Sequence, residues 1–352
     1  MPLRNERFAI PLFFETILGQ QRVTRRELVF GLLPRGLLAF VSLPLLQACM
    51  RAESPASTFI AKVPRYGADI RAAILSGFRE LGVGPGEIRG KTILLKPNLV
   101  ETRAGAPHIN THPAVIRAAA EAFRSLGASS VLLAEGSGHC RDTLRLLEET
   151  GIMDVLAQDR IPFVDLNYDD VYTVPNAGSR SRLKTLTLPL TLRKADWIVS
   201  MAKLKTHHWA GVTLSMKNLF GLMPGSFYGW PKNVLHHAGI EECIYDITAT
   251  VRPHFAIVDG VIGMEGDGPI MGAPKEAGVI VMGRNFPAVD ATCSRVMGID
   301  PGRVGYLADS SGRLGAIREE SILQRGETVG SVISDFDLLQ SIPAQRGLRL
   351  RR

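Results

Sequence analysis

The stretch from residue 203 to residue 221 carries the densest group of side chains that could do chemistry. Three lysines and two histidines fall within fifteen residues: Lys203, Lys205, His207, His208 and Lys217. Lys217 stands among apolar residues, and a desolvated lysine has a lowered pKa that suits it to act as a nucleophile, a base or a covalent anchor. Alternatively, the three lysines bind a carboxylate or a phosphate, or Lys217 only lays its aliphatic stem along an amphipathic helix.

Polar residues also follow two apolar segments that have the pattern of buried strands. Lys96 and Asn98 frame a proline after the first segment, and a Gly-Ser-Gly turn at 136–138 precedes His139 after the second. Backbone N–H groups of such a turn can bind an anion. A solvated strand end and an ordinary turn are the alternatives for these two clusters.

Carboxylates form a third cluster. Asp259 ends an apolar segment, and Glu265 and Asp267 lie in the Gly-rich loop that follows. Carboxylates in a loop suit a hard cation or a general base, although Asp and Gly are also favoured in turns. Two histidines from different segments, His207 and His237, are candidate metal ligands beside them.

Three sets of site residues are predicted from these clusters. The candidate catalytic residues are His139, His207, Lys217 and Glu265. The candidate substrate-binding residues are Lys96, Asn98, Lys203, Lys205 and Asn218. The candidate metal ligands are His207, His237 and Asp259.

The segments between the clusters alternate between strand and helix patterns, which predicts an α/β fold with a mostly parallel sheet and helices on both faces. Short apolar runs predict strands at 92–96, 130–134, 162–166, 185–190, 197–201, 255–259 and 279–282. Helical spacing predicts helices at 67–81, 113–126, 141–157, 236–251 and 286–297, and 320–335 could form a small β element or a cap. Ligands bind beyond the carboxyl ends of parallel strands, so the polar clusters are expected to meet in one site.

The N-terminal 49 residues have the features of a twin-arginine export signal. Paired arginines at 25–26 precede a broken apolar stretch over 31–46, too short for a clean spanning helix. Residues 46–49 (Leu-Gln-Ala-Cys) resemble a lipoprotein processing site with Cys49 as the lipidated residue. The expected location is therefore the periplasm or a membrane-anchored lipoprotein, with membrane contact only through the signal or the lipid.

Four parts of the chain are expected in all. A linker over 50–66 follows the signal, and an α/β domain over 67–345 follows the linker. This domain has candidate lobes at 67–190 and 191–345 with a cleft between them. Residues 346–352 form a basic tail.

Composition limits the remaining classes of function. The net charge is +7, but 1–49 contribute +3 and 346–352 contribute +4, which leaves 31 basic and 31 acidic residues in the body. A neutral body argues against a nucleic-acid partner. The chain has four cysteines and no C-x-x-C pair, which argues against an iron–sulfur or zinc-ribbon module.

The order of several short motifs resembles the domain of unknown function 362 family. The motifs include Lys96-Pro-Asn98, Thr111-His-Pro113, Glu135-Gly-Ser137, Lys203-Leu-Lys205-Thr-His207, Gly211-Val-Thr213, Met216-Lys217-Asn218-Leu-Phe-Gly221, Asp259-Gly and Met264-Glu265-Gly266. The resemblance covers about 90–300. Many members of the family carry an iron–sulfur module, whereas this chain has no iron–sulfur motif.

A looser resemblance is to the nickel-pincer lactate racemase family, in which His residues act with a Lys that anchors the pincer cofactor. The order His139, His207, Lys217 and then His236 or His237 is similar to the order in that family. The resemblance implies that Lys217 is the anchoring position. Two glycines precede that lysine in the family, whereas Ser and Met stand at 215–216 here.

These observations predict an exported enzyme that acts on a small anionic substrate. The most concrete version is racemisation or redox chemistry at a 2-hydroxy acid. The cofactor is open, with a metal ion as the candidate, and so is the oligomeric state. The alternative is a non-catalytic exported protein in which the same residues only hold a ligand, a metal or a cofactor.

Overall fold

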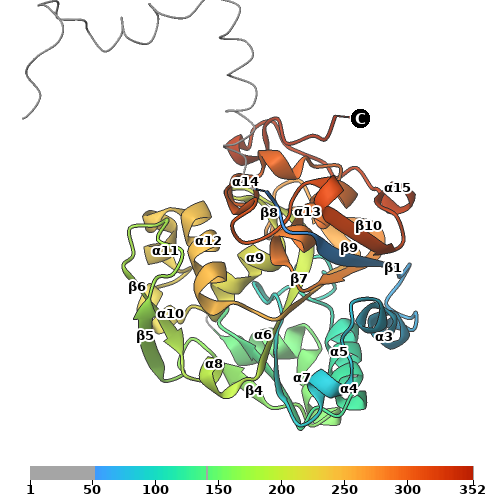
Figure 1. Cartoon of the computed structure of the whole chain (residues 1–352). Helices are drawn as coiled ribbons and strands as arrows, with labels where there is room; N and C mark the ends of the chain where they lie inside the picture. The colour runs from blue at the N-terminus through green and yellow to red at the C-terminus, as the bar shows by residue number, and fades with distance from the viewer. Residues whose placement is uncertain (1–51, 140–141, 352) are drawn as a thin grey trace, which may run out of the picture. The chain divides into compact units, whose positions relative to one another are not determined.

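The strands of the chain come together in one mixed sheet (Figure 1). A computed structural model describes residues 52–139 and 142–351. Within that part of the chain the sheet has nine strands. In order across the sheet they are β11 (Ile322–Gly326), β1 (Ala56–Lys62), β10 (Ala273–Gly283), β9 (Phe255–Glu265), β7 (Trp197–His207), β2 (Thr92–Lys96), β3 (Ser130–Glu135) and β4 (Phe163–Asp165), and β8 (Gly211–Thr213) pairs with β7.

The predicted α/β fold with a mostly parallel sheet is confirmed. The strands β9, β7, β2, β3 and β4 run parallel to one another, and β11 runs parallel to β1. Three pairs are antiparallel: β1 with β10, β10 with β9, and β7 with β8. Parallel strands need crossover connections, and the helices of the chain supply these.

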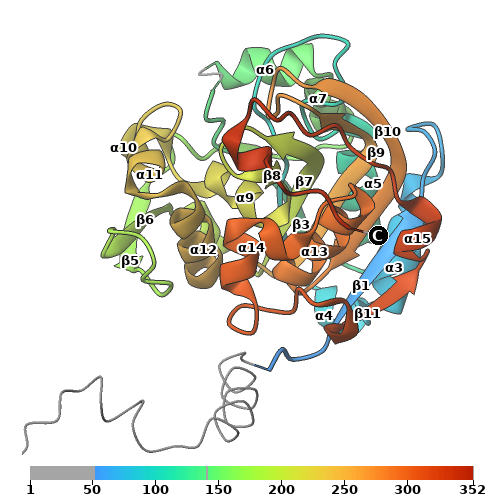
Figure 2. The same cartoon turned by 90° about the horizontal axis from the view of Figure 1, so that it is seen from above.

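Helices cover both faces of the sheet (Figure 2). Successive strand residues point to opposite faces, and in β2 Ile93 and Leu95 belong to one hydrophobic cluster while Leu94 belongs to the other. The first cluster includes residues of α3 (Ile70–Glu80), α5 (Pro113–Ser125) and α7 (Ile152–Gln158). The second includes residues of α9 (Ser215–Asn218), α12 (Ile240–Val251), α13 (Phe286–Val296) and α14 (Gly305–Ser310).

Shorter elements connect this framework. The helices are α4 (Pro85–Ile88), α6 (Thr143–Glu149), α8 (Thr191–Lys194), α10 (Gly225–Tyr228), α11 (Asn233–Ala238) and α15 (Val329–Val332). The 3-10 helices are η1 (Leu219–Leu222), η2 (Pro301–Arg303), η3 (Glu319–Ser321) and η4 (Pro343–Gln345). A separate antiparallel pair consists of β5 (Val171–Pro175) and β6 (Thr185–Pro189).

Two of the predicted helices are each divided by a glycine. The helix expected over 141–157 is α6 and α7, with Gly151 at φ +72° between them. The helix expected over 236–251 is α11 and α12, with Gly239 at φ +109° between them. A positive φ is accessible to glycine at little cost, so each glycine redirects the chain where the apolar periodicity continues.

The expected linker and lobes differ from the structure. Residues 50–66 contain β1, whose buried segment at 58–61 pairs with β10 on one side and β11 on the other. The expected lobes at 67–190 and 191–345 share one sheet, because β2 and β3 continue the order of β7 and β9. Residues 51–352 form one compact unit.

The predicted export signal, Cys49 and the paired arginines lie outside the described residues. Among the residues described, no helix is long and apolar enough to cross a membrane.

Candidate active site

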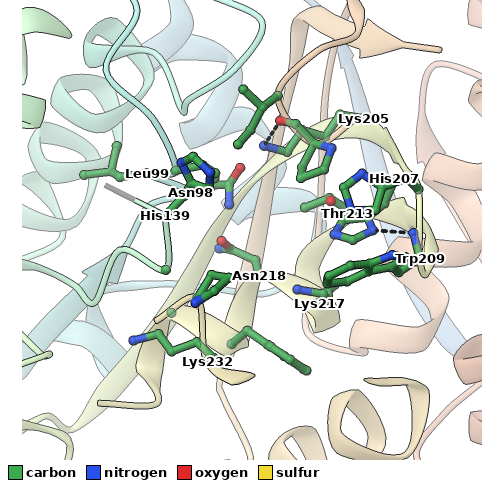
Figure 3. A pocket seen from close by; sticks show the side chains of 18 of the residues that line it. Asn98, Leu99, His139, Lys205, His207, Trp209, Thr213, Lys217, Asn218 and Lys232 are labelled. Carbon is green, nitrogen blue, oxygen red and sulfur yellow. Dashed lines mark hydrogen bonds between the residues drawn. The ribbon is translucent and has the colours of Figure 1, made fainter. Parts of the chain in front are cut away.

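The carboxyl ends of β2, β3 and β7 lie side by side because these strands run parallel. The strand β2 ends at Lys96, β3 ends at Glu135, and β7 continues through Lys205 to His207. A pocket of about 540 Å³ opens here, and side chains from all three strand ends line it (Figure 3). This volume is in the range of small-molecule sites.

The pocket brings together most of the residues predicted from the sequence. Those that line it are Lys96, Asn98, His139, Lys205, His207, Lys217 and Asn218. They come from segments up to 122 positions apart in the chain, from Lys96 to Asn218. The sequence-based expectation that Lys217 and His207 share one hollow therefore agrees with the structure.

A buried ion pair closes the floor of the pocket. The amine of Lys96 lies 2.9 Å from the Glu135 carboxylate and donates to Asn218 Oδ1 at 2.9 Å, and Lys96 and Glu135 are each 1% exposed. Glu135 also accepts the backbone N–H groups of Leu99 and Gly136. Burial lowers the pKa of Lys96 and raises that of Glu135, and their mutual attraction opposes both shifts. Within the pocket, the Lys96 charge is therefore balanced.

Lys205 has a different environment. Its amine donates to the carbonyl oxygens of Ile109 at 2.9 Å and Pro269 at 3.3 Å, and the residue is fully buried. No carboxylate lies within ion-pair distance of it among the described residues. Burial, followed by the charges of Lys203 and Lys217, holds the pKa of Lys205 well below its usual range.

His207 presents a fixed hydrogen-bond donor. Its Nδ1 accepts the backbone N–H groups of Trp209 at 3.0 Å and Ala210 at 3.3 Å (Figure 3). The proton of the neutral imidazole must therefore sit on Nε2. Burial, reinforced by the charge of Lys217, holds the pKa of His207 well below its usual range, so the ring stays neutral at physiological pH.

Lys217 is positioned by the short helix α9. The buried carboxylate of Asp290, on α13, accepts the backbone N–H groups of Ser215 at 2.8 Å and Met216 at 3.0 Å, together with the Ser215 hydroxyl. These bonds satisfy donors at the start of α9, where no intrahelical acceptor exists. The turn that carries Lys217 is thus held by α13, whose Asp290 lies 75 positions after Ser215 in the chain.

The amine of Lys217 has no hydrogen bond or ion pair with any described residue. It lies 3.9 Å from the centre of the Phe220 ring, and Figure 3 shows it pointing into the pocket beside Asn218. Burial, followed by the positive charge of Lys96, lowers its pKa to about 7. A large fraction of the amine is therefore neutral and nucleophilic near neutral pH.

Lys232 and His236 complete the other side of the pocket. The Lys232 amine donates to Asn167 Oδ1 and to the Met223 carbonyl, and burial lowers its pKa to about 7. His236 Nδ1 lies 3.0 Å from the Lys232 carbonyl oxygen, which can only accept, so Nδ1 carries the proton and Nε2 keeps its lone pair. Burial and Lys217 lower the pKa of His236 to about 4.

Two polar atoms in the pocket wall lack partners. Asn98 Oδ1 and Thr213 Oγ1 are buried, and neither has a hydrogen-bond partner among the described residues. Buried polar groups are nearly always paired with protein, water or ligand. These two atoms therefore fit a polar ligand or ordered water in the pocket.

Four predicted site residues do not line the pocket. Lys203 and Asp259 form a fully buried ion pair at 2.8 Å, and Tyr66 donates to Asp259. Glu265 lies 3.2 Å from the Lys275 amine and accepts the backbone N–H of Asp337. The fourth residue, His237, is adjacent to His236 and presents its carbonyl oxygen to Arg182.

The predicted metal set of His207, His237 and Asp259 is not brought together. No group of three or more His, Cys, Asp or Glu residues in the described part of the chain could hold a metal ion. Asp259 is occupied by Lys203 and Tyr66, and His207 uses its Nδ1 lone pair on backbone donors. His236 keeps an Nε2 lone pair in the pocket.

The sequence reasoning did not assign four contributors to the pocket: Glu135, Trp209, Lys232 and His236. Glu135 and His236 belong to motifs that the sequence singled out, and Trp209 follows the predicted histidine pair. Lys232 carried no signal, because a lone lysine in a Gly- and Pro-containing loop has the pattern of a solvated residue.

Comparisons with known proteins give the following similarities. The sequence model of the family described as "Domain of unknown function (DUF362)" matches residues 93–295. The thylakoid-associated protein sll1697 of Synechocystis sp. is 27% identical over 225 residues, which cover 62% of this chain and 67% of that protein.

Two solved structures show distant similarity. One is a protein from Thermotoga maritima, 13% identical, with a TM-score of 0.37 over 64% of this chain and 57% of that one. The other is the lactate racemase apoprotein of Thermoanaerobacterium thermosaccharolyticum, 15% identical, with a TM-score of 0.38 over 70% of this chain and 58% of that one. The chain thus spans just over half the length of each structure.

Proposed function

Since this chain belongs to the domain of unknown function 362 (DUF362) family, whose description states no activity, we propose its function from the pocket. The pocket binds a small organic anion, and Lys217 acts on the bound molecule. The observation that carries this proposal is an excess of lysine amines over carboxylates. Four lysines line the pocket with two carboxylates, Glu135 and Asp267, and a bound anion would favour the protonated form of the amines. Lys205, Lys217 and Lys232 line the pocket with no carboxylate at ion-pair distance from them among the described residues.

The shape and polarity of the pocket support a small organic ligand rather than a bare ion. Apolar side chains contribute to its wall: Leu99, Val100, Trp209, Phe220, Ile270 and Met271. The His207 Nε2–H donor and the unpartnered Asn98 and Thr213 oxygens offer directional hydrogen bonds. A mostly apolar wall with a few convergent polar groups is typical of ligand sites.

The reaction we propose is proton transfer or redox chemistry at a 2-hydroxy acid. A carboxylate on the ligand is attracted by the lysines, which leaves the adjacent carbon near Lys217. The neutral fraction of Lys217 can accept a proton, and the His236 Nε2 lone pair is a second, weaker acceptor. Racemisation is the simplest reaction that such a pair of bases serves.

The donor set bears on the kind of metal or cofactor that the site would hold. The described residues contain no group of three or more His, Cys, Asp or Glu side chains that could bind a metal ion without other ligands. An organic cofactor that carries its own metal needs few protein ligands, and the group would supply hydride or Lewis-acid chemistry. Lys217 is the amine that could anchor it, and His236 Nε2 is an available imidazole ligand.

We also propose that the protein acts outside the cytoplasm. The paired arginines at 25–26 and the apolar stretch at 31–46 support twin-arginine export, and Cys49 supports a lipid anchor. Release of a lipidated form from membranes only by detergent would support the anchored version.

Native mass spectrometry of protein purified from its own host tests the binding function. We expect a small anionic molecule or a cofactor to be retained by the wild type and lost in Lys217→Met. Incubation with single enantiomers of 2-hydroxy acids, followed by chiral chromatography, then separates enzyme from carrier. Binding without conversion would favour the non-catalytic carrier, and no bound molecule together with no conversion would contradict the proposal.

A further inference from the structure

The four lysines that line the pocket differ in what their amines contact. Lys96 bonds to Glu135 and Asn218, Lys205 bonds to two carbonyl oxygens, and Lys232 bonds to Asn167 and Met223. Within the described residues, Lys217 is the pocket lysine whose amine has no acceptor. It is also the lysine that an incoming ligand can reach without breaking an existing hydrogen bond.

We propose that Lys217 forms an imine with the carbonyl carbon of a small 2-oxo acid bound in the pocket. This inference rests on the proposed anion-binding function and names the ligand class as carboxylates with an adjacent aldehyde or ketone. Neutral amines attack carbonyl carbons, and a neighbouring cationic group is one of the recognised ways in which a protein keeps such an amine neutral. Burial keeps the Lys217 amine neutral in the first place, and the charge of the neighbouring Lys96 adds to this effect.

The surrounding groups match the steps of imine formation. The Lys217 nitrogen forms a bond to the carbonyl carbon as the C=O double bond becomes a single bond. The nitrogen gives up one proton and the oxygen takes one up, which gives a neutral carbinolamine. The carbinolamine then loses water: its oxygen leaves with two protons, the nitrogen gives up its proton, and the C=N bond forms. The net change is amine plus carbonyl to imine plus water, with no change in oxidation state.

Two histidines are suited to the proton transfers of this reaction. His207 has a proton on Nε2 that can hydrogen-bond to a ligand oxygen, and its Nδ1 is fixed by backbone donors. His236 has an unprotonated Nε2 that can accept a proton from the nitrogen. Lys205 and Lys232, which have no carboxylate at ion-pair distance in the described residues, can donate hydrogen bonds to the ligand carboxylate, and a bound carboxylate would raise the pKa of both amines.

The apolar side of the pocket favours the same step. The Phe220 ring lies 3.9 Å from the Lys217 amine, and the buried side chain of Leu99 also lines the pocket. Removal of bulk water favours the imine over its hydrolysis. The pocket of about 540 Å³ has room for a 2-oxo acid of two to five carbons beside the lysine stem.

The test is reductive trapping. Wild-type protein is incubated separately with glyoxylate, pyruvate and 2-oxoglutarate in the presence of sodium cyanoborohydride, which delivers hydride to the imine carbon and leaves a stable secondary amine. Intact-mass measurement and peptide mapping locate the adduct. We expect one adduct per chain on Lys217 with at least one of the three acids. In Lys217→Arg we expect the amount of trapped adduct to fall by at least about tenfold.

Two variants and one parallel measurement keep the result interpretable. The exposed Lys194, changed to Arg, is the matched control and is expected to trap like the wild type. Lys217→Met provides a second loss of the amine if Lys217→Arg does not fold, as judged by circular dichroism. Calorimetric titration with the same three acids and with lactate, which has no carbonyl, is run on each protein.

The outcomes separate this inference from the proposed function. An adduct on Lys217 supports both. Saturable binding of the acids with no adduct on Lys217, or with adducts spread over surface lysines to the same extent in Lys217→Arg, overturns the imine and leaves the anion-binding function in place. No binding of any of the four acids and no adduct overturns both.

Discussion

Lys217 differs from the other pocket lysines in its surroundings and not in its chemistry as a free side chain. Its amine faces Phe220 and the cavity, and its neighbours within the pocket include the positively charged Lys96. The desolvation of this lysine was predicted from the sequence, because Met216 and Leu219 flank it. The absence of an acceptor among the described residues could not be predicted, since it depends on where Glu135 and Asn167 direct their oxygens.

The reactivity of Lys217 toward an acylating reagent should depend on pH in an unusual way. Only the neutral amine reacts, so labelling rises as pH passes through the pKa. With a pKa lowered from 10.5 to about 7, half of the maximal labelling rate is expected near pH 7. Pulse labelling with acetic anhydride followed by peptide mapping measures this, with Lys194 as an exposed internal reference. A midpoint for Lys217 close to 10 would contradict the described burial.

The elements around the site show why its position was predictable and its details were not. The apolar runs placed strands at 92–96 and 130–134 correctly, and the parallel arrangement placed their polar ends at one edge. The strand β7 was predicted to stop at 201, because Lys203 and Lys205 have the pattern of a loop. They lie inside a strand that is buried throughout, and their partners, Asp259 and the Ile109 carbonyl, are 56 and 96 positions away in the chain. Nothing in a local pattern reports such partners.

The helix α9 depends on a carboxylate outside its own segment, and this gives a test at the level of the element. Asp290→Asn keeps the size of the side chain but replaces one acceptor oxygen with a donor, so the N–H groups of Ser215 and Met216 cannot both be satisfied. We expect a loss of about 1–3 kcal/mol in the free energy of unfolding and weaker pH-7 labelling of Lys217.

The N-cap residue of α13, the helix that carries Asp290, provides the matched control for Asp290. Asn285 caps α13 by accepting the Ala288 N–H and makes no hydrogen bond with α9 in the described structure. Asn285→Ala should cost about 1 kcal/mol while leaving Lys217 labelling unchanged. Chemical denaturation and the same labelling assay measure both effects. Equal changes in Lys217 labelling in the two variants would show that Asp290 has no specific role in positioning the lysine.

At the level of the whole molecule, the pocket exists because distant segments approach closely at one edge of the sheet. Gly221 lies shortly after α9, the helix that carries Lys217, and it packs against the Lys96–Glu135 pair. Its carbonyl oxygen accepts the Gly136 N–H at 2.8 Å. The position of the pocket could be predicted from the parallel order of strands. The contributions of Lys232 and His236 could not, because they depend on the path of residues 223–239, and the sequence did not predict the short helix α10 or the break at Gly239 in this segment.

This close approach predicts a size limit at Gly221. A Cβ atom there would overlap the Glu135 carboxylate and the Lys96 amine. Both groups are buried, and neither can move away without breaking their ion pair. Gly221→Ala should therefore reduce the free energy of unfolding by about 1–3 kcal/mol. Gly86→Ala is the control, because a Cβ at Gly86 meets no atom within 4 Å, and it should be neutral or slightly stabilising. Thermal or chemical unfolding distinguishes the two, and equal stability of both variants would contradict the described packing.

Calorimetric titration of the folded protein with pyruvate and with lactate tests most directly whether the lysine-lined pocket binds a small organic anion. The wild type is expected to bind at least one of them at a single site, more weakly as ionic strength rises. Lys217→Met is expected to lose at least about tenfold in affinity, equivalent to about 1.4 kcal/mol, while Lys194→Met keeps the wild-type affinity. Undetectable binding of both acids to the wild type, or the same affinity in Lys217→Met, would contradict the account.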